Sequence, residues 1–208
     1  DKVLVWLWLP TSAKVEIGQI LTAAELEYVS LRALDALQCS PGTTICRIGL
    51  SGKVLAMADA TTVLHEFACW SAEQALLGER EAGREPDPRS WTAINVKRKW
   101  LKGEATDEEL EAAASAAWDA QEEATYAASP AANAAASAAN AAARDAVSAA
   151  TRAACDTSWA ATWVNVTVAP GLAAIAAWEA ARSASWAAQN AKLEEMLNDL
   201  LEEESTNG

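Results

Sequence analysis

A lone histidine and a nearby cysteine are the first residues whose types could support catalysis. His65 and Cys69 stand four residues apart, so on a helix they would share one face. A nucleophilic thiolate needs a base in contact with it, and a metal site needs further ligands at matching spacing. The sequence has no second histidine and no CxxC pair. We therefore expect a structural His65 and a Cys69 that acts as a small buried side chain.

Carboxylates are abundant and come in runs. The runs in the middle of the chain comprise Glu108, Glu109, Glu111, Glu122 and Glu123, and others lie at 194–195 and 202–204. Catalysis by paired carboxylates needs two groups that face one cleft and have separated pKa values. Runs at helix ends are instead typical of solvated faces. Because no Glu-x-x-His motif accompanies them, we expect no metal site and no cofactor.

One basic cluster interrupts this acidic chain. It comprises Lys97, Arg98, Lys99, Trp100 and Lys102. Two interpretations of it stay open. The cluster suits a phosphate or an acidic partner surface, with the Trp100 ring adjacent. It also falls in the last turn of a predicted helix, where cations interact favourably with the helix dipole and can neutralise the acidic run that follows.

Known catalytic motifs are missing from the sequence. It contains no phosphate loop, no nucleophile elbow and no dinucleotide-binding fingerprint. One histidine and scattered carboxylates do not assemble a nucleophile, a base and an orienting group. We therefore do not expect an enzyme.

The composition indicates closely packed helices. Alanine fills 51 of the 208 positions, and ten tryptophans stand beside a single phenylalanine. Alanine is the strongest helix former but buries little area, so tryptophan must supply much of the apolar burial. The net charge of −13 opposes direct binding to nucleic acid, and it permits either a basic protein partner or mimicry of the charge of nucleic acid.

Neither a membrane span nor a disulfide framework is expected. The longest strongly apolar run, residues 3–10, is far shorter than the roughly 20 residues that a spanning helix needs. The four cysteines are Cys39, Cys46, Cys69 and Cys155. Free thiols in a reducing cytoplasm are the favoured interpretation, and a Cys39–Cys46 pair is the alternative.

The pattern of elements predicts a mainly α protein. Residues 1–58 form a small mixed α/β segment, residues 59–204 an alanine- and tryptophan-rich helical bundle, and residues 205–208 a disordered tail. The N-terminal segment is expected to hold a strand at 3–9, a helix from the Thr22–Glu25 capping box to Gln38, and a hairpin of 43–50 and 53–58 joined at Ser51-Gly52. The expected bundle helices are 59–77 capped by Asp59, 88–102 capped by Asp87-Pro88, 107–128 opened by the Thr106–Glu109 capping box, 130–163 and 172–201, with a strand-like run at 164–168.

Part of the chain resembles a known family. The stretch 64–110 carries an Ala68-Cys69 helix and the junction WLKGEATDEEL (100–110), and a closing helix contains Gln189-Asn190. Over roughly residues 61–204 this resembles an alanine-rich helical family of bacterial and phage genomes that is described as immunity-protein-like. The resemblance implies an all-α bundle without catalytic residues and a role in neutralising a partner.

The leading hypothesis is a non-enzymatic inhibitor of a protein partner, a bacterial toxin or a defence protein. The expected partner-binding residues are Lys97, Arg98, Lys99, Trp100, Lys102, Glu108, Glu109, Glu111, Glu122 and Glu123. Two alternatives stay open. A small anionic, nucleotide-like ligand could bind between the helices, or the chain could self-associate through alanine faces as a homodimer or larger assembly.

Overall fold

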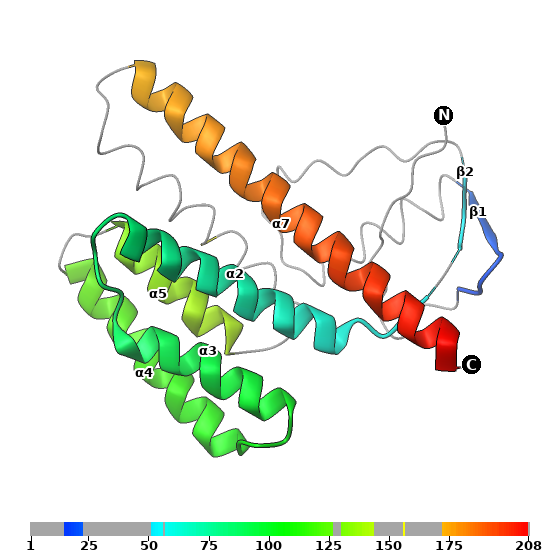
Figure 1. The fold of residues 1–208 in the computed structure, drawn as a ribbon, viewed down its shortest axis with the longest axis horizontal. Coiled ribbons are helices and arrows are strands. Elements are labelled where there is room, and N and C mark those ends of the chain that lie inside the picture. The colour runs from blue at the N-terminus through cyan, green and yellow to red at the C-terminus, as the bar shows by residue number, and fades with distance from the viewer. Residues whose placement is uncertain are drawn as a thin grey trace. The chain divides into compact units, whose positions relative to one another are not determined.

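The computed structural model describes residues 15–22, 51–55, 57–126, 130–143, 156 and 172–207. As predicted, the protein is mainly helical (Figure 1). The chain divides into two units, residues 1–59 and residues 60–208. No helix in the described ranges is both long enough and apolar enough to cross a membrane.

The described part of the N-terminal unit is a pair of short antiparallel strands, β1 (Ile20–Thr22) and β2 (Ser51–Lys53). Leu21 faces Gly52 in the register, and two backbone hydrogen bonds between residues 18–19 and Val54 extend the pair. The expected turn at Ser51-Gly52 is therefore wrong, since both residues lie in a strand. Glycine favours turns, but in this short ladder its backbone serves the strand pairing.

Thr22 ends β1 opposite Ser51, a position that suits its β-branched side chain. The helix that the Thr22–Glu25 capping box predicts lies outside the described residues, so the cap stays a prediction. The other expected elements of this unit, at 3–9, 23–38 and 43–50, lie outside the described residues, as do Cys39, Cys46 and Cys155 and the strand-like run 164–168.

Helix α2 (Thr61–Glu81) is longer than predicted. Its N-cap is Ala60, which has no side chain that can cap, so the prediction of Asp59 as the cap is wrong. The C-terminus continues past Leu77 to a Schellman motif, in which Gly83 has a φ of 77° and the Arg84 N–H donates to the Glu79 carbonyl. The residue that ends the helix is therefore Gly83, which lies six residues beyond the predicted end at Leu77.

Helices α3 (Pro88–Leu101) and α4 (Asp107–Tyr126) begin where the capping residues predicted. The Asp87 carboxylate accepts a hydrogen bond from the Arg89 N–H, and Pro88 opens α3. Gly103, with a φ of 72°, ends α3 in a second Schellman motif. The capping box before α4 is also confirmed, because the Thr106 hydroxyl accepts from the Glu109 N–H at 3.2 Å while the Glu109 carboxylate accepts from the Thr106 N–H at 2.8 Å.

The last two described helices differ from the predictions at their C-termini. Helix α5 (Pro130–Ala142) ends well before residue 163, and Ala143 already lies in a turn, although no glycine or proline marks this end. Helix α7 (Leu172–Asn207) starts as predicted but runs past Leu201. The expected disordered tail is therefore helical as far as Asn207, consistent with the good helix formers Glu202–Glu204.

Alanine forms most of the bundle core. Helices α2, α3, α4 and α5 contact one another, except for α2 with α4, and α7 contacts α2 (Figure 1). The innermost contact joins Ala93 of α3, Ala117 of α4 and Ala143 after α5, with Leu110 and Ala114 packed against it. Small side chains at these contacts let the helix axes approach closely.

The capping box at α4 yields a stability prediction. Thr106→Ala removes the hydroxyl acceptor and is expected to lower the free energy of unfolding by about 1 kcal/mol. Thr106→Ser keeps the acceptor and should stay close to the parent protein. Urea denaturation followed by circular dichroism measures both. Equal stability of the Thr106→Ala variant and the parent would contradict a stabilising role for the cap.

Candidate functional site

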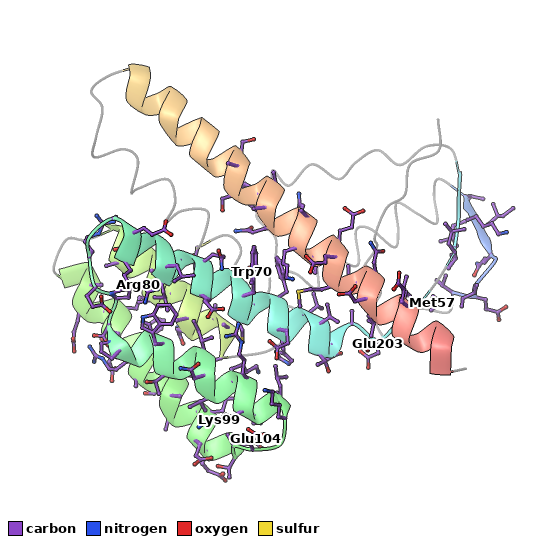
Figure 2. The ribbon with its side chains drawn as sticks, viewed as in Figure 1. Met57, Trp70, Arg80, Lys99, Glu104 and Glu203 are labelled. Atoms are coloured by element: carbon purple, nitrogen blue, oxygen red, sulfur yellow. The ribbon has the colours of Figure 1, made fainter. Side chains whose placement is uncertain are left out.

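The basic cluster does not form one exposed patch. Lys97 is buried, at 1% exposure, and its Nζ lies 4.1 Å from the centroid of the Trp100 ring. Arg98 is half-buried and reaches α2, where its guanidinium pairs with Glu73 at 2.8 Å and lies 3.6 Å from Glu66. Lys99 is exposed (Figure 2), and so is Lys102. Arg98 thus joins α3 to α2, and of the cluster only Lys99 and Lys102 are exposed to solvent.

Trp100 links α3 both to α4 and to α2. Its Nε1–H donates to the Asp107 carboxylate at 2.7 Å, which ties the end of α3 to the first turn of α4. On the other side its ring meets the ring of His65 edge to face, with the centroids 5.7 Å apart. The Trp100 indole therefore contacts Lys97 of its own helix and His65 of α2.

His65 and Cys69 lie in the packed interior of the bundle. Cys69 is a free thiol with no exposed surface, and His65 is also buried. Burial, together with the nearby Glu66 carboxylate, raises the pKa of the Cys69 thiol to about 12. The thiol keeps its proton at neutral pH, so this environment opposes thiolate chemistry.

A partly buried ion pair that the sequence analysis missed lies at the C-terminal end of α2. The Glu79 carboxylate is almost fully buried and accepts two hydrogen bonds from the Arg84 guanidinium, at 2.6 and 2.9 Å. The Schellman turn folds Arg84 back over the helix end and so brings the two side chains together. Their spacing of five residues across Gly83 was the available signal in the sequence.

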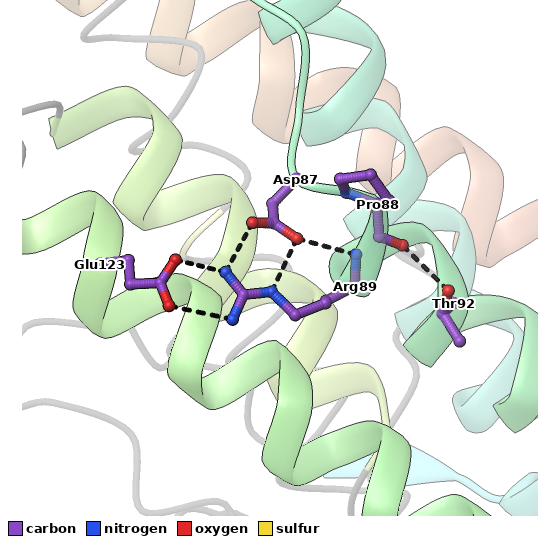
Figure 3. Close-up of polar contacts among 5 residues, drawn as sticks. All are labelled: Asp87, Pro88, Arg89, Thr92 and Glu123. Atoms are coloured by element: carbon purple, nitrogen blue, oxygen red, sulfur yellow. Dashed lines mark hydrogen bonds and ion pairs between the residues drawn. The ribbon is translucent and has the colours of Figure 1, made fainter.

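A second ion-pair network crosses from α3 to α4 (Figure 3). The Arg89 guanidinium donates to both oxygens of Asp87, at 2.9 and 2.7 Å, and to both oxygens of Glu123. These hydrogen bonds lower the pKa values of the Asp87 and Glu123 carboxyls and raise the pKa of Arg89. Glu123, an expected partner-binding residue, therefore forms an intramolecular ion pair with Arg89.

The outward face of α4 gathers most of the remaining expected residues. Its inward face buries Ala113, Ala117 and Ala120. The opposite face carries exposed residues at helical spacing, namely Glu108, Glu111, Ser115, Trp118, Asp119 and Glu122. In the part of the chain that the structure describes, the four carboxylates of this face make no ion pair or hydrogen bond. Glu109 is exposed as well, but its carboxylate caps α4.

Trp118, like Ser115 and Asp119, lies on this face although the sequence analysis did not single it out. It is 42% exposed, which is unusual for so large an apolar side chain. Its position seven residues after Glu111 and four before Glu122 was the available signal, since all three then share one helix face. Carboxylates therefore lie on both sides of Trp118 along this face, and the residues between Glu111 and Trp118 are all alanine or serine.

Metal-site geometry and comparison with known proteins both leave the function of the α4 face unassigned. Among the described residues, no group of three or more His, Cys, Asp or Glu side chains could hold a metal ion. Comparison of the chain with protein-family models, with curated proteins and with solved structures found no match. The chemistry of the α4 face itself must therefore carry the functional argument.

The Arg89 network predicts a pH-dependent contribution to stability. Because Asp87 and Glu123 have lowered pKa values in the folded protein, their contribution to stability is fully present above the ordinary carboxyl pKa and is lost as the pH falls from there through the lowered values. Arg89→Gln should therefore lose less stability between about pH 7 and about pH 3 than the parent does. Urea denaturation at both pH values measures this difference.

Lys99→Gln is the matched control, because it removes one exposed positive charge from the same helix. This variant should keep the acid sensitivity of the parent. If Arg89→Gln lost stability on acidification as steeply as Lys99→Gln, the network would not be the source of the pH dependence.

Proposed function

We propose that this protein is a non-enzymatic binding protein that neutralises a cationic protein partner, in the manner of an immunity protein or a phage anti-defence protein. The partner would be a bacterial toxin or a defence protein. The observation that supports this proposal is the outward face of α4, where the exposed carboxylates of Glu108, Glu111, Asp119 and Glu122 share one helix face with Trp118. An aromatic centre within a charged border is the usual anatomy of a protein interface.

The charge of the whole chain favours the same class of partner. A net charge of −13 repels nucleic acid and other acidic surfaces and attracts basic proteins at long range. Complementary charges of this kind raise the rate of association more than they raise the final affinity. The association rate is therefore expected to fall as salt is added, because salt screens exposed charges.

Helix α4 is held firmly enough to present its face without rearrangement. The capping box fixes its first turn, Trp100 is hydrogen-bonded to Asp107, and Arg89 holds Glu123 near its far end. Alanines pack its inward side against α3 and α5. A surface that is ordered before binding loses less conformational entropy when the partner arrives.

The proposal predicts that α4 carboxylates, rather than acidic charge in general, drive binding. A tagged protein is used to capture partners from nuclease-treated bacterial lysate, and the captured protein is then purified. The triple variant Glu108→Gln, Glu111→Gln, Glu122→Gln should associate with it about tenfold more slowly at low salt. Surface plasmon resonance at several salt concentrations measures the rates.

The matched control is the triple variant Glu194→Gln, Asp199→Asn, Glu203→Gln on α7, which removes the same charge from other exposed positions. It should associate at close to the parent rate. If both triple variants slowed association equally, the α4 face would not be the binding surface, and if neither did, charge would not drive the encounter.

A further inference from the structure

We draw no further inference here: the strongest candidate, the exposed apolar surface patch of Ile17, Ile20 and Leu55 on the two-stranded β1–β2 ribbon, carries nothing, because no feature of the described residues shows what covers it.

Discussion

Close packing of alanine against alanine is the constraint on which the rest of this bundle depends. Each buried alanine removes little apolar area from water, so the helices must approach closely and make many such contacts to gain stability. Polar and aromatic contacts then fix how the helices lie: Arg98 joins α3 to α2, Arg89 joins α3 to α4, and Lys97 packs under Trp100. Arg84 pairs with the buried Glu79 carboxylate, so removing Arg84 would leave an uncompensated buried charge.

The packing of alanine also determines which side chains of α4 are exposed to solvent. Because the inward side of α4 is filled by alanine, its charged residues and Trp118 have only the outward side available. The basic cluster behaves differently, since Lys97 and Arg98 are drawn into the contacts between α2 and α3. Candidate binding residues therefore divide into those that hold the bundle together and those that remain accessible on α4.

Local sequence signals predicted the elements whose ends depend on local chemistry. Asp87-Pro88, the Thr106–Glu109 capping box and Gly103 fix helix ends through neighbouring backbone groups, and the structure confirms them. The sequence could not show which side of α3 packs inward, so the burial of Lys97 had to come from the three-dimensional arrangement. The strand at Ser51-Gly52 was missed because its partner, β1, lies some thirty residues earlier in the chain.

The most direct test of this account is the stability of an Ala117→Leu variant beside Ala112→Leu. Ala117 has no exposed surface at the contact of α3 with α4, whereas Ala112 lies on the exposed side of the same helix. Overpacking at position 117 should lower the free energy of unfolding by about 1–3 kcal/mol, while the change at position 112 should stay within about 0.5 kcal/mol. Urea denaturation measures both variants. If Ala117→Leu were as stable as Ala112→Leu, close alanine packing would not govern how α4 is held, and the assignment of its outward face would lose its basis.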